Sequence, residues 1–316
     1  MTPRVSVVLS TYNPHLGRLD RTLDGLFGQT LSTNEWELIV VDNRSTPPVD
    51  AVALRLARHP NTRLVREARL GLIYGRISGV KNSTGELIVF CDDDTLFARS
   101  YLQSAIQVFA ENPALGGAIG KSLPEFEVRP PNWTNEFFGC LGLWDHGDQP
   151  LFQSNWDGSY PSFGGGGGGA VFRRTALADT LTHFERDGEN KLTGRAGKSF
   201  ASGEDNYIVM SLLKKGWTVC YAPELRMTHV IPFLRLTREY LSRLNHGIAK
   251  SWVQVLALHG VCPWKPVDSW TVPLRKGRAY FRYHAWAGPA EYVRWRGACG
   301  NFEGRALIGR QSYESA

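Results

Sequence analysis

The sequence Glu86-Leu87-Ile88-Val89-Phe90-Cys91-Asp92-Asp93-Asp94 joins an apolar run to three consecutive carboxylates. The apolar run, 86–91, predicts a buried strand. Open α/β sheets bind their ligands beyond the carboxyl ends of their strands, which is where the three aspartates stand. Carboxylate oxygens are preferred ligands of Mg²⁺ and Mn²⁺. The stretch therefore predicts a divalent metal ion that holds a diphosphate at the edge of a sheet.

Strand and helix signals alternate through the first third of the chain. Apolar runs predict strands at 5–9, 36–41, 63–65 and 86–91. Apolar residues at helical spacing predict helices that follow Leu16 and Ile73, a short helix through 52–56, and a helix after a capping box at Ser100-Tyr101-Leu102-Gln103. This alternation predicts an α/β fold in which a mostly parallel sheet, flanked by helices, forms a nucleotide-binding half over residues 1–114.

The rest of the chain has a different pattern. From 115 to 202 the periodicity fades and Gly, Pro, Trp and Asn become frequent, which predicts loops and a few antiparallel strands in an acceptor half, 115–236. Near its end we expect a helix that stops at Gly216 and a strand, 217–221, that Pro223 stops. A long amphipathic helix from Thr237 opens a helical appendage, 237–316, which leaves 1–236 as the first domain.

The formal net charge of +6 is concentrated at the end of the chain. Residues 260–316 contain nine Lys or Arg and four Asp or Glu, interleaved with tryptophans and tyrosines. This composition suits a surface that lies against anionic lipid headgroups. A plain solvated face is the alternative. A nucleic-acid partner is not expected, because no nucleic-acid-binding motif accompanies the charge.

Cysteine usage and hydropathy suggest where the protein resides. The five cysteines are scattered and form no C-x-x-C pair, the start has no signal-peptide pattern, and no apolar stretch reaches the length of a membrane span. These features predict a cytoplasmic protein in a reducing compartment. With the basic appendage, they predict one that can lie peripherally on the inner face of the cell membrane.

A second acidic cluster, Glu204-Asp205, follows Gly203 and opens a predicted helix. Acids in the first turn of a helix are ordinary partners of the helix dipole. The functional alternative is that Asp205 takes a proton from an attacking hydroxyl, a step that requires a base near the reacting atoms. Glu204 would then orient the acceptor or the donor. Both are candidate catalytic residues.

The ends of the first two predicted strands supply candidate nucleotide contacts. Thr11, Tyr12 and Asn13 follow the first strand, and Asp42 and Asn43 follow the second. Because these strand ends face one crevice, Thr11 and Tyr12 can support a base or ribose, and Asp42 can accept a hydrogen bond from it. The alternative is that Asp42 and Asn43 only shape a turn. A dinucleotide-binding Rossmann enzyme would need glycines at the first turn, where this chain has none.

The aspartate triplet has two possible interpretations. It can be a solvated turn, or it can be a binding site for a metal ion and a nucleotide sugar. If strand geometry continues, Asp92 and Asp94 point the same way and Asp93 points elsewhere. Asp94 is then the metal ligand, Asp92 a metal or ribose partner, and Asp93 a further contact of the nucleotide sugar. His229 lies just past a predicted strand end and can complete the metal shell, although a core histidine is the common alternative.

Six consecutive glycines, Gly164 to Gly169, precede the segment 170–174, which has an ordered pattern. They match G-x-G-x-x-G trivially, and a flexible linker is the alternative. Because glycine has no Cβ, its backbone amides can approach a ligand closely. The run therefore predicts a wall of the substrate site, with Gly167, Gly168 and Gly169 on the acceptor side.

Together these segments resemble a family 2 glycosyltransferase of the inverting type with a GT-A fold. The resemblance extends from about Val5 to Tyr240, and its last part is similar to bacterial polysaccharide-assembly members. The segments that carry it are Val5–Asn13, Gln29-Thr30, Glu37–Ser45, Gly71-Leu72, Arg76, Gly85–Phe90 with Asp92-Asp93-Asp94 as a DXD motif, Gly169–Arg174, Ser202–Asp205, Tyr221–His229 and Arg235-Leu236-Thr237.

The resemblance implies a metal-dependent, hexosyl-type transferase that uses Mg²⁺ or Mn²⁺. It would move a sugar from a nucleotide-diphosphate donor to a hydroxyl of a glycan or lipid-linked acceptor, in cell-surface polysaccharide biosynthesis. The resemblance makes Asp205 the base and adds Arg76 to the residues that bind the nucleotide sugar.

The chain departs from the family pattern at three positions. Asn43 stands where members that hold uracil often have a second acid, which leaves the base open. Ile77 replaces a common asparagine, and Thr95 replaces a frequent acid. None of these departures removes a residue that the mechanism requires.

Two other functions stay open at this point. A sugar nucleotidyltransferase has a related sheet, but its glycine-rich loop with a lysine would follow the first strand, where this chain has Thr11-Tyr12-Asn13-Pro14. A catalytically silent glycan- or nucleotide-binding module would need neither acidic cluster.

Overall fold

The computed structural model describes residues 2–165, 167–186, 194, 195, 197 and 200–314. The strands are β1 (Val5–Thr11), β2 (Trp36–Asp42), β3 (Thr62–Arg66), β4 (Leu87–Asp92), β5 (Thr95–Phe97), β6 (Leu115–Phe126), β7 (Leu151–Gln153), β8 (Val171–Arg173) and β9 (Thr218–Ile231). The α-helices are α1 (Leu16–Phe27), α2 (Leu72–Lys81), α3 (Tyr101–Glu111), α4 (Arg174–Arg186), α5 (Glu204–Lys214), α6 (Arg238–Leu258), α7 (Val272–Arg282) and α8 (Pro289–Glu314). The 3-10 helices are η1 (Leu56–Arg58), η2 (Asn132–Leu141), η3 (Phe233–Leu236) and η4 (Ser269–Thr271).

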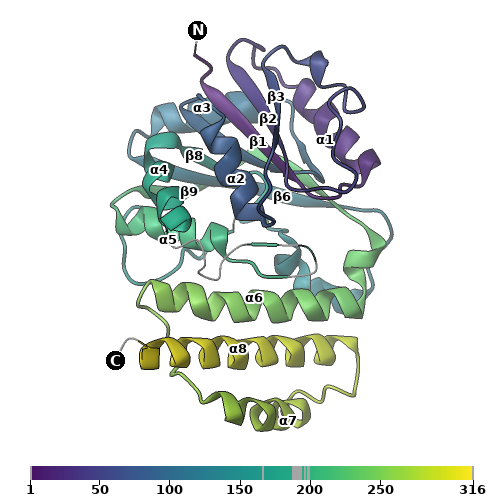
Figure 1. Ribbon diagram of the computed structural model, residues 1–316, viewed down its shortest axis with the longest axis vertical. Coiled ribbons are helices and arrows are strands. Elements are labelled where there is room, and N and C mark those ends of the chain that lie inside the picture. Colours follow the sequence, from purple (N-terminus) through teal and green to yellow (C-terminus); the bar gives the residue numbers. More distant parts are fainter. Residues whose placement is uncertain (1, 166, 187–193, 196, 198–199, 315–316) are drawn as a thin grey trace.

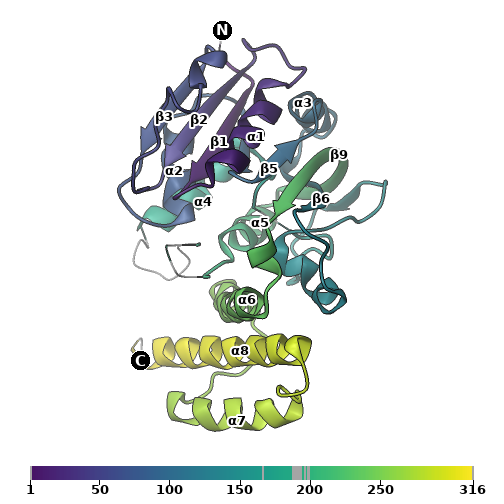
Figure 2. The same ribbon diagram turned by 90° about the vertical axis from the view of Figure 1, so that its right-hand side faces the viewer.

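The strands form one mixed sheet in the order β3-β2-β1-β4-β8-β6-β9-β5, with β7 paired to β9. β1 is parallel to β2 and β4, and β2 is parallel to β3. β8 runs antiparallel between β4 and β6, whereas β6 and β9 are parallel. Figures 1 and 2 show helices on both faces of this sheet.

Side chains of the parallel strands alternate between two hydrophobic layers. Val7 and Val89 belong to the layer that includes residues of α1 and α3. Val8 and Phe90 belong to the layer that includes residues of α2, α4 and α5. Because both faces are covered, the central residues of β1, β2 and β4 are apolar on both faces, at 7–9, 38–41 and 87–91. The predicted α/β fold, with a mostly parallel sheet flanked by helices, is confirmed.

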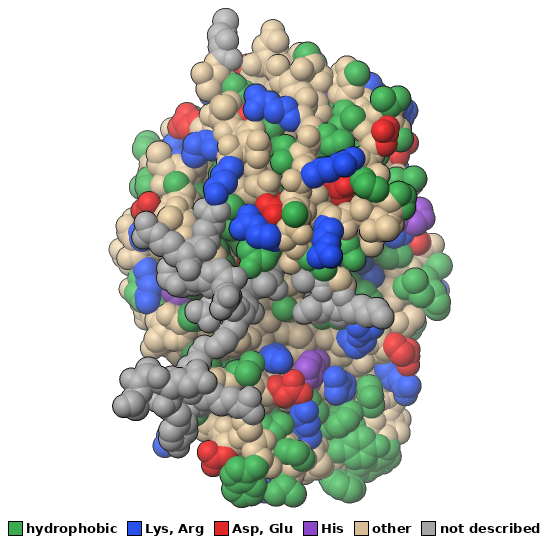
Figure 3. Space-filling view, viewed as in Figure 1, with side chains coloured by type: hydrophobic (Ala, Val, Ile, Leu, Met, Phe, Trp, Pro, Cys, Tyr) green, Lys and Arg blue, Asp and Glu red, His purple; other side chains and the backbone are tan. Residues whose placement is uncertain are grey.

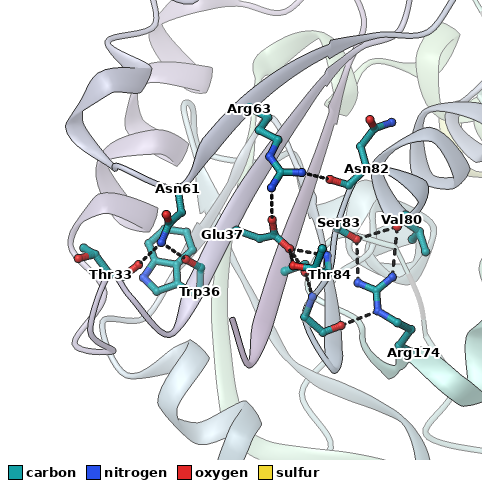
Figure 4. Close-up of polar contacts among 12 residues, drawn as sticks. Thr33, Trp36, Glu37, Asn61, Arg63, Val80, Asn82, Ser83, Thr84 and Arg174 are labelled. Carbon is teal, nitrogen blue, oxygen red and sulfur yellow. Dashed lines mark hydrogen bonds and ion pairs between the residues drawn. The ribbon is translucent and has the colours of Figure 1, made fainter. Parts of the chain in front are cut away.

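A buried carboxylate ties the amino ends of neighbouring strands together (Figure 4). Glu37, in β2, is 2% exposed and accepts hydrogen bonds from Ser6 Oγ at 2.8 Å and from Thr84 N and Oγ1 at 2.5 and 2.9 Å. Arg63 Nη2 lies 3.6 Å from its other oxygen. These partners compensate for the burial of the charge. The network lies at the opposite end of the strands from Asp92, so it stabilises the sheet.

Residues 115–202, for which the sequence predicts loops and a few antiparallel strands, contain more regular structure than that. They include the long strand β6 and helix α4. The predicted strand stop at Pro223 is wrong, because β9 continues to Ile231. The pairing register with β6 shifts between Gly120 and Lys121, which leaves residues 223–225 without partners on β6. A bulge at this point accommodates a proline, which has no amide hydrogen to donate to the ladder.

The helix predicted after Ser100 is present as α3, but its capping box does not form, and a second helix prediction is wrong. Ser100 is the N-cap residue of α3, but its side chain caps no helix amide. Gln29 Oε1 accepts the Leu102 amide at 3.0 Å instead, so a distant side chain satisfies the first turn. The short helix predicted through 52–56 is a series of turns that leads into η1.

Three helices, α6, α7 and α8, form a helical appendage, and α8 lies between the other two (Figures 1 and 2). α6 begins where the sequence predicts, because the Thr237 side chain accepts a hydrogen bond from the Tyr240 amide at 3.2 Å. α8 approaches α6 closely at Gly300, where a Cβ would lie 2.1 Å from the His246 carbonyl oxygen. A glycine is therefore required there. The division into domains 1–236 and 237–316 stays a prediction.

Candidate active site

The carboxyl ends of β1 and β4 open onto a cavity of about 810 Å³. Because the two strands are parallel neighbours, Ser10 of β1 lies beside Asp92 of β4. The residues predicted from sequence that line the cavity are Thr11, Tyr12, Asn43, Arg76, Asp92, Asp93, Asp94, Gly167, Gly168, Glu204, Asp205 and His229. The structure thus brings both acidic clusters, which lie far apart in the chain, to one cavity.

The aspartate triplet is folded into a turn. Strand geometry does not continue past Asp92, because the chain turns at Asp93 and Asp94, so the premise that Asp92 and Asp94 point the same way does not hold. Asp92 Oδ2 accepts a hydrogen bond from the Gly168 amide at 3.1 Å. Asp93 accepts one from the Thr11 hydroxyl. Burial, together with the charge of Asp94, raises the pKa of Asp93 to about 7.

Asp94 is paired with His229 of β9 and with Arg235 of η3, the 3-10 helix that follows β9. Arg235 Nη2 lies 2.5 Å from Asp94 Oδ2, and His229 Nε2 lies 3.3 Å from Oδ1. Arg235 Nη1 is also 2.9 Å from His229 Nε2. Burial opposes ionisation, but Arg235 and His229 hold the pKa of Asp94 well below its ordinary value. His229 lies within β9, opposite Thr95, and not past the strand end as predicted.

The amino end of α5 presents Glu204 and Asp205 to the same cavity. Gly203, with a φ of 108°, turns the chain into the helix. Burial raises the pKa of Asp205, and the charge of Arg76 opposes this rise. Burial, together with the charge of Asp205, raises the pKa of Glu204 to about 7. Carboxyl groups with pKa values shifted toward neutrality are typical of functional sites.

Arg76, in α2, connects the two acidic clusters. It is 1% exposed, and its guanidinium carbon lies 4.8 Å from the centre of the Phe90 ring. Nη1 donates a hydrogen bond to Asp205 Oδ1 and lies 3.6 Å from Glu204 Oε1. Nη2 lies 3.6 Å from Asp92 Oδ1. A buried guanidinium and buried carboxylates each require the opposite charge, so these groups hold one another in place.

The glycine-rich segment contacts both acidic clusters through its backbone. The Gly168 amide donates to Asp92, and the Gly167 amide donates to Asp205. A Cβ at Gly168 would lie 2.9 Å from Asp92 Oδ2, so the close approach requires glycine. Gly166, in the middle of the predicted run, lies outside the described residues.

Three predicted site residues do not line the cavity. Asp42 is buried and accepts hydrogen bonds from the amides of Ser45 and Val49 at 2.8 and 3.1 Å, so it shapes a turn, as the alternative reading had it. Asn13 accepts a hydrogen bond from the backbone of the same turn at 2.8 Å. The Gly169 amide is bonded to the backbone of β4 at 2.6 Å.

The cavity also contains residues that the sequence does not single out. Arg235 lies in a segment that resembles the family, but only the fold shows that it reaches Asp94. Trp144 and His146 line the cavity from a segment without periodicity. Ile248 of α6 lines it as well, so the appendage contributes to the wall.

A sequence model of glycosyl transferase family 2 matches residues 6–181, more than half of the chain. The chain belongs to glycosyl transferase family 2. Among curated relatives of this family 2 chain, an N-acetylglucosaminyltransferase of Bradyrhizobium diazoefficiens is 23% identical over 234 residues, 73% of this chain and 46% of the relative. A glucosyl-dolichyl phosphate glucuronosyltransferase of Haloferax volcanii is 22% identical over 237 residues, 72% of this chain and 69% of the relative. The chain therefore spans less than half of the first relative's length.

Two solved structures share the fold of this family 2 chain. S. aureus TarS 1–349 in complex with UDP has a TM-score of 0.51 at 14% identity, over 99% of this chain and 92% of that one. The mannosyltransferase PcManGT from Pyrobaculum calidifontis, in complex with GDP-Man and Mn²⁺, has a TM-score of 0.53 at 20% identity, over 100% of this chain and 81% of that one. The predicted GT-A fold is confirmed. No helix in the described part of the chain is both long enough and apolar enough to cross a membrane.

Proposed function

We propose that this chain moves a sugar from a nucleotide-diphosphate donor to a hydroxyl of a glycan or lipid-linked acceptor, with inversion at the anomeric carbon. The observation that carries the proposal is the position of Arg76, which joins Asp92 of one acidic cluster to Asp205 of the other. The cavity of about 810 Å³ lies in the range of sites that enclose small ligands. Family membership and the nucleotide ligands of TarS and PcManGT support a nucleotide-sugar donor.

Asp205 is the proposed base. Arg76 engages its Oδ1, so Oδ2 is the oxygen that takes the proton of the acceptor hydroxyl. The acceptor oxygen forms a bond to the anomeric carbon, and the bond from that carbon to the diphosphate oxygen breaks, its electron pair leaving on the diphosphate. Burial makes Asp205 a stronger base than an exposed aspartate, because it raises the pKa. Glu204 orients the acceptor or the donor sugar.

The two substrates are proposed to enter from different sides of the cavity. Thr11, Tyr12 and Asn43 line it beside β1 and β2, where the nucleoside would lie. Tyr12 is 40% exposed, so its ring is free to contact a base. Gly167 and Gly168 line it near Asp205, where the acceptor hydroxyl must arrive.

A divalent ion, Mg²⁺ or Mn²⁺, is proposed at Asp94 and His229, with Asp92 nearby. Asp94 Oδ1 and His229 Nε2 lie 3.3 Å apart and would hold the ion together. Arg235 contacts both side chains in the structure, so its guanidinium would have to move aside when the ion binds. The described residues contain no group of three or more potential ligands placed around one ion. Two protein ligands suffice where diphosphate oxygens and water complete the coordination. When bound, the ion neutralises charge on the departing diphosphate.

The acceptor class is the least specified part of the proposal. The name of the Haloferax volcanii relative includes a dolichyl phosphate, which supports a lipid-linked acceptor. Ile248 of α6 lines the cavity and gives its wall an apolar side chain that such a chain could contact. A role in cell-surface polysaccharide biosynthesis, on the cytoplasmic side of the membrane, follows as part of the same proposal.

The test is release of the nucleotide from a panel of nucleotide sugars by the purified full chain, with Mn²⁺, Mg²⁺ or a chelator. We expect at least one donor to be hydrolysed slowly without acceptor, only with metal, and much more slowly by Asp205→Asn. Asp179→Asn, a change of an aspartate that is 80% exposed on α4, is the matched control and should release nucleotide normally. Metal-dependent nucleotide binding without any release would contradict the proposal and indicate a silent binding module.

A further inference from the structure

A second cavity lies between α7 and α8, at the end of the molecule away from the sheet. Its volume is about 830 Å³. Four arginines line it, Arg275, Arg278 and Arg282 from the α7 side and Arg305 from α8, and we call it the arginine groove. No aspartate or glutamate is among the described residues that line it. The groove therefore concentrates positive charge without a facing negative charge.

Two acidic residues of α8, Glu291 and Glu303, form ion pairs with residues outside the groove. Glu303 lies 2.6 Å from Lys276 Nζ and 3.1 Å from His246 Nε2. Glu291 pairs with Arg294 at 3.4 Å. The pKa of Arg305 is lowered by burial and then by the charge of Arg275, a repulsion that nearby acids would remove. The charge of the groove is thus available for an anionic partner.

Large apolar side chains are exposed beside the groove. Trp270, Leu274, Phe281 and Trp286 are 74%, 69%, 68% and 56% exposed. Leu274 and Phe281 are seven residues apart in α7, so they lie on one side of the helix, with Arg278 between them. Figures 1 and 2 show α7 as the outermost element at this end, and Figure 3 shows hydrophobic side chains gathered there next to Lys and Arg side chains.

We propose that α7 docks the protein onto a bilayer that contains anionic phospholipid. Arg275, Arg278, Arg282 and Arg305 hold lipid phosphates in and around the groove, while the exposed tryptophans, Leu274 and Phe281 enter the headgroup region. Arginine is suited to bind phosphate with two parallel hydrogen bonds. A polar glycan or a nucleic acid would match the arginines but leave the exposed leucine and phenylalanine without a partner.

This contact is peripheral and independent of the proposed sugar transfer. Cationic and apolar side chains on one exposed helix are the composition of helices that lie in the membrane interface. No described helix is long and apolar enough to span the membrane. Docking requires no residue of the active-site cavity, so a failure of the transfer chemistry would leave it intact.

The test is sedimentation of the full chain with vesicles of phosphatidylcholine, with and without phosphatidylglycerol. We expect binding only to the anionic vesicles, weakened by salt. The double variant Arg278→Glu/Arg282→Glu should bind at least about 25-fold more weakly, because each basic residue near an anionic surface strengthens binding about fivefold and the two losses multiply. Arg99→Glu, a charge reversal at an exposed arginine next to α3, should bind normally.

Further experiments distinguish a lipid bilayer from other binding partners. Phe281→Ser should weaken vesicle binding while the charge is kept, and inorganic phosphate at millimolar concentration should not release the protein. Equal binding to neutral vesicles, or normal binding by the double variant with an unchanged unfolding transition, would overturn the proposal. A dimer in sedimentation velocity that the double variant abolishes would overturn it too, because the face would then be covered by a second copy.

Discussion

Arg76 and Asp205 form an ion pair inside the candidate active-site cavity, with Nη1 of the arginine donating to Oδ1 of the aspartate across 129 residues of sequence. The same guanidinium reaches Asp92 and Glu204 at 3.6 Å each. A buried arginine in this position sets both the geometry and the acidity of the proposed base, because it orients one carboxylate oxygen and opposes the effect of burial on the pKa.

Replacement of Arg76 by methionine should therefore affect both acidity and stability. The pKa of Asp205 should rise further, so the rising limb of the pH-rate profile should move to higher pH. Loss of one partner from a buried ion pair should also lower the free energy of unfolding by about 3 kcal/mol or more. Arg76→Lys, which keeps the charge, should shift the profile less. A pH-rate profile that stays in place in Arg76→Met would show that the pair does not set the base.

Metal binding should depend on Asp94 and His229. Titration of Mn²⁺ followed by electron paramagnetic resonance, with UDP or GDP present, should show at least about tenfold weaker binding in Asp94→Asn and in His229→Gln. Asp179→Asn, which removes an exposed carboxylate on α4, is the matched control and should bind Mn²⁺ normally. Equal Mn²⁺ affinity in the unmodified chain and the three variants would show that Asp94 and His229 do not bind the ion.

Stability should fall as the pH rises from about 4.5 to about 7 through the contribution of Glu204. Its pKa is raised from 4.5 to about 7 in the folded protein, so in this window the folded state keeps a proton that the unfolded state releases. Glu204→Gln removes this titration. Urea denaturation at several pH values across the window measures the free energy of unfolding of both proteins. The free energy of Glu204→Gln relative to that of the unmodified chain should increase as the pH rises. A constant difference between the two would contradict the raised pKa.

The network around Glu37 should matter for stability and not for chemistry. Glu37→Ala leaves buried donors of Ser6 and Thr84 without an acceptor, and should lower the free energy of unfolding by about 2 kcal/mol or more. Glu37→Gln keeps one acceptor oxygen and should lose less. Urea denaturation measures both. An alanine variant as stable as the unmodified chain would show that the network contributes little.

The sequence predicts correctly those strands and helices that depend only on neighbouring residues in the chain. The strand that precedes Asp92 and the helix capped by Thr237 are found where they are predicted, because each depends on a continuous segment. The cap at Ser100 is wrong because Gln29, 73 residues from Leu102, supplies the acceptor. The strand stop at Pro223 is wrong because a bulge against β6 absorbs the proline.

The site follows the same rule. The acids at 92–94 and 204–205 can be named from the sequence, because they stand at the ends of recognisable elements. The ion pairs of those acids cannot be predicted from the sequence. The resemblance names Arg76 only as a contact of the nucleotide sugar, and only the fold shows that Arg76 and Arg235 reach the acids across distant parts of the chain. Asp42 has the same strand-end position as Asp92, and only the hydrogen bonds to its own turn separate the two.

A single-turnover rate for Asp205→Asn, measured with a donor that the unmodified chain turns over, tests the proposed chemistry most directly. The rate of transfer should fall by about 100-fold or more, while the dissociation constant of the donor stays unchanged. Glu204→Gln should slow the reaction less. Transfer by Asp205→Asn at close to the normal rate would contradict the assignment of Asp205 as the base.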